Sequence, residues 1–192
     1  MGELNEETIE VWLVLHGYAQ LAKDFIIPFN ALVDGKRFIV APEGLNKFYA
    51  KGFGGKPAAT WMTSEDREAE ITDYLNYLNT LCVALQIPDG VKLIVLGFSQ
   101  GVATASRFVH QSNLNVDAFI IYSGDLAAEL ANPISAKIKA LPITYVTGTK
   151  DPLITPEKHQ QVFDLMHQLN ARVVTFEGGH EVKEDALLRL VD

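Results

Sequence analysis

A serine between two glycines is the strongest chemical signal in this sequence. Residues 95–105 read VLGFSQGVATA, which places Ser99 between Gly97 and Gly101 in a G-x-S-x-G pattern. Apolar residues precede it and small, helix-compatible residues follow it. A tight strand-to-helix turn would expose the hydroxyl above the sheet edge and direct the next backbone N–H, that of Gln100, to the same place. These features suit attack on a carbonyl and stabilisation of an oxyanion, although a serine that only caps a helix is the alternative.

The base that would activate this serine is predicted to be His180. A serine hydroxyl is a weak nucleophile without a base, and in this kind of turn the partners follow in the order Ser, acid, His. His180 comes after a predicted strand and the residues EGG, whereas His16 precedes Ser99. The other histidines lie in predicted helices, where solvent-facing side chains are expected: His110, His159 and His167. A loop histidine with a purely structural role is the alternative for His180.

Two aspartates could orient that base. Asp151 lies in GTKDPLITP and Asp125 in YSGDL, and each follows a predicted strand that comes after Ser99. We predict Asp151 as the acid and keep Asp125 as its rival, while a simple turn aspartate is the structural alternative. A second oxyanion donor is expected after the strand that ends in LHG, where the N–H of Tyr18 is best placed.

An irregular stretch, residues 43–63, is predicted to cover the site, because long loops in compact domains are often functional. Apolar side chains from this stretch and from the segment after Asp151 could line a substrate pocket, with ordinary core packing as the alternative. The predicted pocket residues are Phe48, Tyr49, Phe53, Trp61, Met62, Leu153 and Ile154. A phosphate-loop interpretation of the glycines in this stretch fails, because Ala50 and Pro57 occupy two of the required positions.

The elements that must position these residues alternate along the chain. Stretches that are apolar at consecutive positions predict strands covered on both faces. The predicted strands are residues 9–15, 37–42, 91–97, 116–124, 142–148 and 171–178, and the predicted helices are residues 23–32, 64–85, 99–111, 156–169 and 181–191. Alternation of this kind predicts a parallel sheet with helices on both faces, in a single domain spanning residues 1–192.

Composition narrows the class of protein further. The chain has 192 residues, a formal net charge of -8 and a single cysteine, Cys82. The acidic balance argues against nucleic acid as a partner, and the lone cysteine excludes an internal disulfide. An acidic N-terminus does not fit a signal peptide, and no apolar run is long enough for a membrane span. We therefore expect a cytoplasmic protein. Cys82 falls on the apolar face of a predicted helix, which makes it a weak candidate nucleophile.

The motifs LHGYAQ, GFSQG, GTKDPLITP and GGH, in this order, give the chain a resemblance to the α/β-hydrolase superfamily. Within it, the chain resembles the small carboxylesterase/phospholipase group related to acyl-protein thioesterases, and residues 61–71 resemble a segment of bacterial predicted esterases. The resemblance implies a mostly parallel sheet of roughly six or seven strands with minimal or no cap domain. Two departures from the group are Ala19 and Val102, at positions where it often has glycine or another small residue.

The resemblance also implies roles for individual residues. Ser99 would be the nucleophile, Asp151 the orienting acid and His180 the general base, with backbone N–H groups of Tyr18 and Gln100 forming the oxyanion hole. It implies no metal and no organic cofactor. The expected activity is hydrolysis of small-molecule carboxylic esters with short to medium acyl chains. Thioesterase or lysophospholipase activity, acyl transfer to another alcohol, a non-catalytic ligand-binding protein and a chance match in a nucleotide-binding domain are the alternatives. A homodimer is left open.

Overall fold

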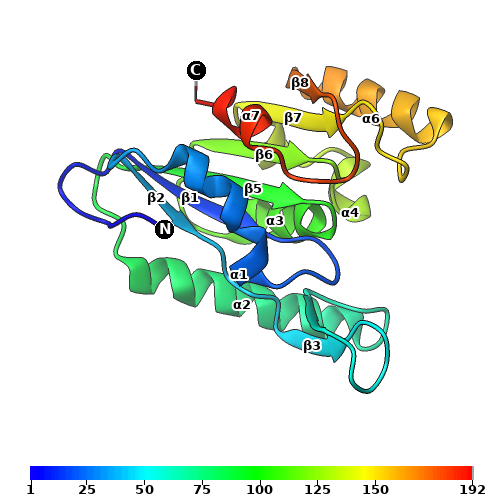
Figure 1. The fold of residues 1–192 in the computed structure, drawn as a ribbon. Coiled ribbons are helices and arrows are strands. Elements are labelled where there is room, and N and C mark those ends of the chain that lie inside the picture. Colours follow the sequence, from blue (N-terminus) through cyan, green and yellow to red (C-terminus); the bar gives the residue numbers. More distant parts are fainter. Residues whose placement is uncertain (192) are drawn as a thin grey trace.

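The computed structural model describes residues 1–191, apart from the side chains of residues 156, 157 and 159. Its centre is a six-stranded sheet in the order β2-β1-β5-β6-β7-β8, in which every neighbouring pair is parallel (Figure 1). The strands are β1 (Glu10–Leu15), β2 (Arg37–Val40), β5 (Lys92–Phe98), β6 (Ala118–Tyr122), β7 (Ile143–Gly148) and β8 (Arg172–Phe176). This confirms the predicted parallel sheet, and each strand lies within one of the predicted ranges or extends it by one residue.

Helices cover both faces of the sheet, which explains why its strands are apolar at consecutive positions. Val11, Leu13 and Leu15 of β1 face one apolar cluster, and Trp12 and Val14 face the other. The first cluster includes residues of α2 (Arg67–Leu85), α3 (Gln100–Gln111), α4 (Ala128–Ala131), α5 (Ala136–Lys139) and α6 (Pro156–Gln168). The second includes residues of α1 (Ala22–Phe25), the 3-10 helix η1 (Ile27–Leu32) and α7 (Glu184–Leu188). Full burial of each such side chain contributes about 1.5–3 kcal/mol.

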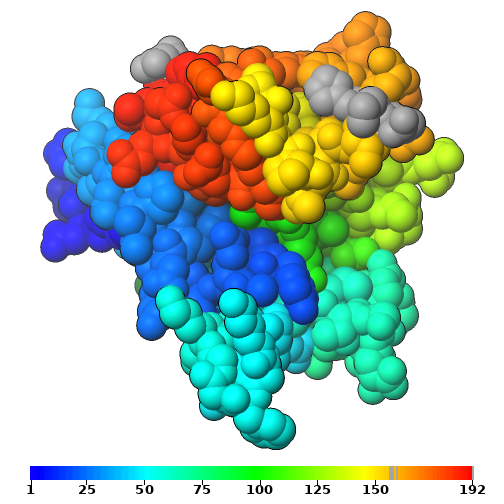
Figure 2. Space-filling model, turned by 45° about the vertical axis from the view of Figure 1, so that its right-hand side comes forward, coloured from blue at the N-terminus to red at the C-terminus, as the bar shows by residue number. Residues whose placement is uncertain are grey.

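The strand register places the ends that carry the candidate residues at one edge. Leu15 at the end of β1 pairs with Gly97 of β5, and Phe98 pairs with Tyr122 at the end of β6. Further along the sheet, Gly148 at the end of β7 pairs with Phe176 of β8. Because carboxyl ends of parallel strands share one edge, the loops that follow them converge there. Figure 2 shows this edge, where the segment around residue 100 (green) surfaces between segments coloured blue, yellow and red.

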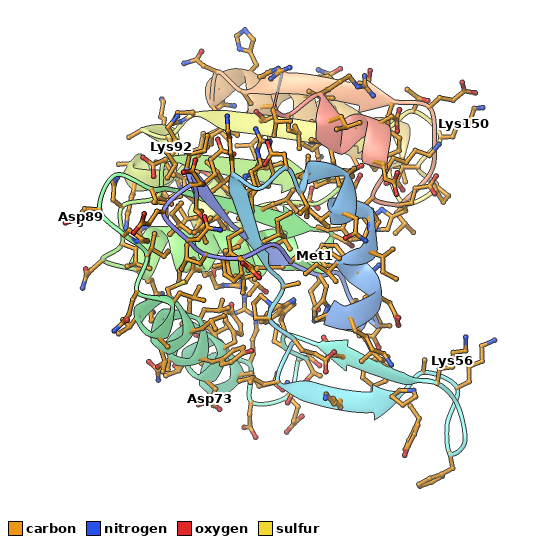
Figure 3. All side chains as sticks on the ribbon, turned by 60° about the vertical axis from the view of Figure 1, so that its left-hand side comes forward. Met1, Lys56, Asp73, Asp89, Lys92 and Lys150 are labelled. Carbon is orange, nitrogen blue, oxygen red and sulfur yellow. The ribbon has the colours of Figure 1, made fainter. Side chains whose placement is uncertain are left out.

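A β-hairpin occupies much of the stretch that was predicted to be irregular. β3 (Asn46–Tyr49) pairs antiparallel with β4 (Pro57–Thr60), and Figure 3 shows this hairpin standing away from the sheet, with Lys56 close to its outer end. The strands escaped prediction because neither has three consecutive β-branched or aromatic residues, as the equally short β2 does: β3 is Asn-Lys-Phe-Tyr and β4 is Pro-Ala-Ala-Thr.

Several predicted helices also differ in extent. Pro28 divides the predicted helix at residues 23–32 into α1 and η1. α2 starts at Arg67 instead of Ser64, after Asp66 in a left-handed conformation (φ 45°) and without a side-chain cap. α4 and α5 were not predicted, because four residues are too few to show a helical repeat. In the part of the chain that the structure describes, no helix has the length and apolar character to cross a bilayer.

Candidate active site

Ser99 forms the sharp turn between β5 and α3 that the sequence predicted. Its backbone has φ 53° and ψ -120°, a conformation that costs energy for a residue with a side chain. A Cβ on Gly97 would lie 2.4 Å from the carbonyl oxygen of Gly101, and a Cβ on Gly101 would lie 2.2 Å from that of Leu15. Only glycine therefore fits on either side of the serine, since each position is pressed against backbone.

Asp151 and His180 form the hydrogen-bonded pair that the sequence anticipated. His180 Nδ1 lies 2.7 Å from Asp151 Oδ2, and the Asp151 side chain is fully buried whereas that of His180 is 20% exposed. Asp151 Oδ1 accepts a hydrogen bond from the backbone N–H of Leu153. The ring of Phe98, next to the serine in sequence, packs against His180 with centroids 4.9 Å apart. Asp125, the rival acid, instead forms an ion pair with Lys158 at 2.7 Å.

Close contact between two loops brings this pair together. Gly148 ends β7, and a Cβ there would lie 2.4 Å from the carbonyl oxygen of Gly179. The N–H of Lys150 donates to the carbonyl of Gly178 at 2.8 Å, so the loops are also linked by a backbone hydrogen bond. Beyond the histidine, the Tyr122 hydroxyl accepts a hydrogen bond from the N–H of Lys183. Burial raises the pKa of Tyr122, so this phenol stays protonated at neutral pH.

Ser99 and His180 line one cavity of about 310 Å³. No hydrogen bond joins these two described side chains in this structure. Contacts between a nucleophile and its base are often long without a substrate and shorten when one binds. Ser99 and His180 thus face one cavity, and the hydrogen bond to Asp151 fixes the orientation of the imidazole ring.

The loop after β1 lies directly against the serine. A Cβ on Gly17 would lie 3.1 Å from the Cβ of Ser99. Tyr18 is the next residue after this close approach. The backbone N–H of Tyr18 has no acceptor among the described residues. Gln100 is the first residue of α3, where a backbone N–H lacks an acceptor within the helix. Tyr18 and Gln100 thus each have a backbone N–H without an acceptor among the described residues, and their role as oxyanion donors stays a prediction.

His16 fixes this loop, a role that sequence reasoning missed. The side chain is fully buried; its Nε2 accepts from the N–H of Gly44 at 2.9 Å, and Nδ1 donates to the carbonyl of Gly17 at 2.7 Å. Desolvation lowers the pKa of His16, against smaller opposing effects of the Gly17 hydrogen bond and the Glu43 charge. A neutral ring is required, because Nε2 is an acceptor. The position of His16 just before the glycine of LHG was the available signal.

The side chain of Gln100 links the serine turn to the segment after β4. Its Oε1 accepts hydrogen bonds from the Thr60 hydroxyl at 2.9 Å and from the N–H of Trp61 at 3.3 Å. Its Nε2 donates to the carbonyl of Met62 at 3.0 Å. The glutamine inside GFSQG therefore has a structural function in addition to its backbone N–H, which a sequence alone could not reveal.

The predicted pocket residues divide into two groups. Leu153 and Ile154 line the cavity beside Ser99. The five aromatic and methionine side chains of the 43–63 stretch do not, which corrects that part of the prediction. Trp61 is fully buried and donates to the His16 carbonyl, Phe48 stacks on Tyr18, Met62 packs on the core, and Tyr49 and Phe53 point into solvent. Phe48, Tyr49 and Phe53 belong to the hairpin, whereas Trp61 and Met62 follow it and pack on the core.

The hairpin does border a second cavity, of about 640 Å³, that also reaches His180. Ala50, Lys51, Lys56, Pro57 and Ala58 form its hairpin side. Residues of α1 and of the start of η1 also line it. The two cavities therefore meet at the imidazole.

The remaining candidates have structural explanations. Ala19 has φ 60°, which explains why glycine suits this position in the group that the chain resembles. Val102 is fully buried, and its Cγ2 would lie 2.6 Å from a Cβ on Gly124. Burial raises the pKa of the Cys82 thiol to about 11, so it is not a thiolate at neutral pH. Among the side chains that the structure describes, no three His, Cys, Asp or Glu residues are grouped so that they could hold a metal ion.

The parallel sheet, the serine turn at its carboxyl edge and the helices on both faces are those of the α/β-hydrolase fold. The chain belongs to the FSH1 serine hydrolase family, whose model matches residues 10–187. A search of the curated proteins found no match. The family match confirms the resemblance to the α/β-hydrolase superfamily.

Solved structures agree with this class. A Zea mays acyl-protein thioesterase 2 is 21% identical, with a TM-score of 0.71 over 95% of this chain and 91% of that one. Esterase PE8 is 22% identical, with a TM-score of 0.71 over 99% and 93%. A phospholipase/carboxylesterase from Dyadobacter fermentans is 18% identical, with a TM-score of 0.66 over 99% and 91%. At these identities the likeness shows the fold alone.

Proposed function

We propose that this serine hydrolase cleaves carboxylic esters with short to medium acyl chains, through Ser99, His180 and Asp151. The observation that carries the proposal is the 2.7 Å contact between the buried carboxylate of Asp151 and Nδ1 of His180, which lines the same cavity as Ser99. An imidazole held in this way has its Nε2 available to accept a proton. The proposed class is therefore that of enzymes acting on carboxylic ester bonds.

In the proposed mechanism, His180 Nε2 takes the proton of Ser99 as its oxygen attacks the ester carbonyl carbon. The N–H groups of Tyr18 and Gln100 stabilise the resulting oxyanion, and Asp151 stabilises the imidazolium. Collapse of the intermediate breaks the bond to the leaving alcohol, which receives the proton from His180. Water, deprotonated by the same imidazole, then attacks the acyl-enzyme and releases the acid. Neither a metal nor an organic cofactor takes part in the proposed reaction.

Thioester hydrolysis is the second candidate for the same site, and it is favoured by the likeness to a protein described as an acyl-protein thioesterase. Lysophospholipids are a third substrate class, favoured by the neighbour described as a phospholipase/carboxylesterase. A parallel assay of oxygen esters, thioesters and lysophospholipids of equal acyl length ranks the three. A non-catalytic ligand-binding protein would hydrolyse none of them.

The test is hydrolysis of p-nitrophenyl esters from acetate to palmitate by the wild type and by Ser99→Ala. We expect the highest kcat/KM with short or medium chains and a loss of kcat up to about 10⁶-fold in the variant. Ser112→Ala is the matched control, because it removes a hydroxyl from the opposite end of α3 and should leave kcat unchanged. Equal rates for Ser99→Ala and the wild type would contradict the mechanism. A rate that peaks only at long chains would contradict the proposed substrate class.

The rest of the proposal concerns the chain as a whole. We infer a single domain at residues 1–192, a segment at 43–63 that covers the site and a cytoplasmic location, and we leave open a homodimer in solution. Light scattering behind a gel-filtration column tests the last of these. A mass equal to one chain at every concentration would exclude the homodimer.

A further inference from the structure

The cavity beside Ser99 extends along one face of α3 toward a buried arginine. Gln100, Ala103 and Arg107 line it, and these positions are three and four residues apart, on a common helix face. The rise of an α-helix separates the first and last by about 10 Å along the axis. Because long helical side chains lean toward the N-terminus, the guanidinium reaches back toward the serine. A cationic group therefore lies at the far end of the cavity in which the ester would react.

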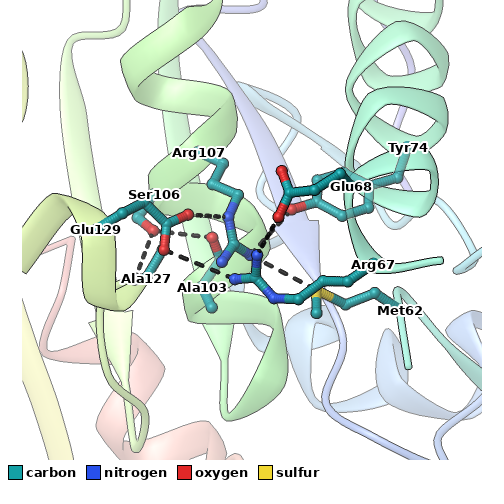
Figure 4. Close-up of polar contacts among 9 residues, drawn as sticks. All are labelled: Met62, Arg67, Glu68, Tyr74, Ala103, Ser106, Arg107, Ala127 and Glu129. Carbon is teal, nitrogen blue, oxygen red and sulfur yellow. Dashed lines mark hydrogen bonds and ion pairs between the residues drawn. The ribbon is translucent and has the colours of Figure 1, made fainter. Parts of the chain in front are cut away.

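Arg107 retains unused hydrogen-bond donors. Its side chain is 5% exposed, and Nε donates to Glu129 Oε1 at 2.6 Å. Nη1 donates to the Tyr74 hydroxyl at 3.1 Å and lies 3.7 Å from Met62 Sδ (Figure 4). Among the described residues, Nη2 has no acceptor for its two hydrogens. Nη2 is not buried, so a ligand in the cavity can supply its acceptor.

A second wall of the cavity carries further donors without partners. Ser123 is 4% exposed, has φ 47°, and its hydroxyl makes no hydrogen bond. The backbone N–H groups of the next three residues, Gly124, Asp125 and Leu126, also have no acceptor among the described residues. Consecutive N–H groups after a left-handed residue commonly form anion-binding concavities. Arg107 and residues 123–126 thus both present hydrogen-bond donors that have no acceptor among the described residues.

The other charges at this cavity compensate one another. Lys158 and Asp125 both line it, and they pair with each other at 2.7 Å. Glu129, the partner of Arg107, does not line the cavity; it is 48% exposed and also lies 3.7 Å from Arg67. The charge of Glu129 is therefore shared with solvent and with a second cation, which leaves Arg107 able to attract an anion from the cavity side.

We propose that this cavity, here called the Arg107 cavity, binds a carboxylate on the substrate, so that the preferred esters carry a negative charge a few bonds from the reacting carbonyl. The inference rests on the proposed function and names its substrate class. A half-ester of a short dicarboxylic acid has this chemistry in its acyl part, and an ester of a short hydroxy acid has it in its alcohol part. The volume of about 310 Å³ suits a small group of this kind.

The first experiment compares charged and neutral esters with the wild type. For the acyl part, p-nitrophenyl hydrogen glutarate is compared with p-nitrophenyl pentanoate, and for the alcohol part, 4-acetoxybutyrate is compared with butyl acetate. We expect a kcat/KM ratio of about 10- to 100-fold in favour of the charged ester in one of the two pairs, as a charged hydrogen bond would give. The pair that shows it identifies the half of the ester that enters the Arg107 cavity. No preference in either pair overturns the proposal.

The second experiment separates substrate recognition from a structural ion pair. Arg107→Met should abolish the preference, so that the kcat/KM ratio of the charged to the neutral ester falls to about one. Glu129→Gln breaks the same ion pair without touching the cavity, so it should keep or increase the preference. If both variants change the ratio alike, Arg107 is structural and the proposal is wrong. If thermal unfolding shows that Arg107→Met does not fold, Arg107→Lys replaces it. We then expect a reduced preference for the charged ester, and an unchanged preference would contradict the proposal.

A binding measurement keeps this inference distinct from the proposed function. Calorimetry with glutarate should show binding to the wild type and its loss in the Arg107 variant, whether or not any ester is hydrolysed. If neutral esters are hydrolysed and charged esters are not preferred, only the proposal of carboxylate binding in the Arg107 cavity is overturned. Absence of all hydrolysis together with glutarate binding would overturn only the esterase mechanism. Absence of glutarate binding to the wild type counts against the carboxylate site in either case.

Discussion

Among the individual side chains, the sequence favoured Asp151 as the acid but could not eliminate Asp125, because each follows a strand at the same edge. The sheet order supplies the reason for the observed pairing. His180 follows β8, Asp151 follows the adjacent β7, and Asp125 follows β6, which is one strand further away. Sequence patterns give the order of strands along the chain but not their order in the sheet, so neighbouring loops could not be identified from them.

We predict that Asp151→Asn lowers kcat by about 10⁴-fold, since the amide would hold the imidazole in the wrong tautomer. Asp125→Asn, which removes only the ion pair with Lys158, should change kcat far less. Steady-state hydrolysis of a neutral p-nitrophenyl ester measures both. A severe loss in Asp125→Asn with a mild one in Asp151→Asn would show that the acid is assigned wrongly.

Among the secondary-structure elements, those with consecutive or periodic apolar residues were predictable, and four short elements without such a pattern were not. The strands of the sheet and α2, α3 and α6 show clear periodicity or consecutive apolar residues. β3, β4, α4 and α5 have four residues each, and tertiary contacts rather than local preference determine them. The missed hairpin also displaced the predicted pocket, because it changed where Phe48, Tyr49 and Phe53 point.

The contact between the β7–α6 and β8–α7 loops gives a prediction for Gly148. We expect Gly148→Ala to lower the free energy of unfolding by about 1–3 kcal/mol, because its Cβ would lie 2.4 Å from the Gly179 carbonyl oxygen. Activity should fall further than stability explains, since the two loops carry Asp151 and His180. Denaturant unfolding and ester hydrolysis measure the two effects.

Gly179→Ala is the matched control for that variant. Its Cβ would meet no atom closer than 3.8 Å, although it belongs to the same contact and adjoins His180. We expect near-normal stability and activity. A Gly148→Ala protein that resembles this control would mean that the loop contact does not position the acid and the base.

For the molecule as a whole, the parallel sheet followed from strands that are apolar on both faces, and the clustering of loops at one edge followed from the sheet being parallel. The two cavities that meet at His180 could not be foreseen, because they depend on how the hairpin and the loops after β6 and β7 pack. The buried, neutral state of His16, which links the loop after β1 to Gly44, could not be foreseen either.

His16 makes global stability depend on pH. Burial lowers its pKa in the folded state, so below the unfolded-state value of about 6.5 the unfolded chain binds more protons. Stability should therefore fall as the pH drops from about 6.5 toward the lower folded-state pKa. Urea unfolding between pH 5 and pH 7 measures how steeply the free energy of unfolding changes with pH. This slope should be smaller in His16→Gln. Equal slopes in the two proteins would show that His16 does not contribute.

The most direct test of the account is covalent labelling with a fluorophosphonate, followed by peptide mass spectrometry. An activated serine displaces fluoride from phosphorus, whereas an ordinary serine does not react. We predict that the probe adds to Ser99 of the folded protein, and that Ser99→Ala and Asp151→Asn abolish or greatly slow the reaction. Folded wild-type protein that stays unlabelled, or that carries the probe on another serine with Ser99 free, would contradict the assignment of Ser99, His180 and Asp151.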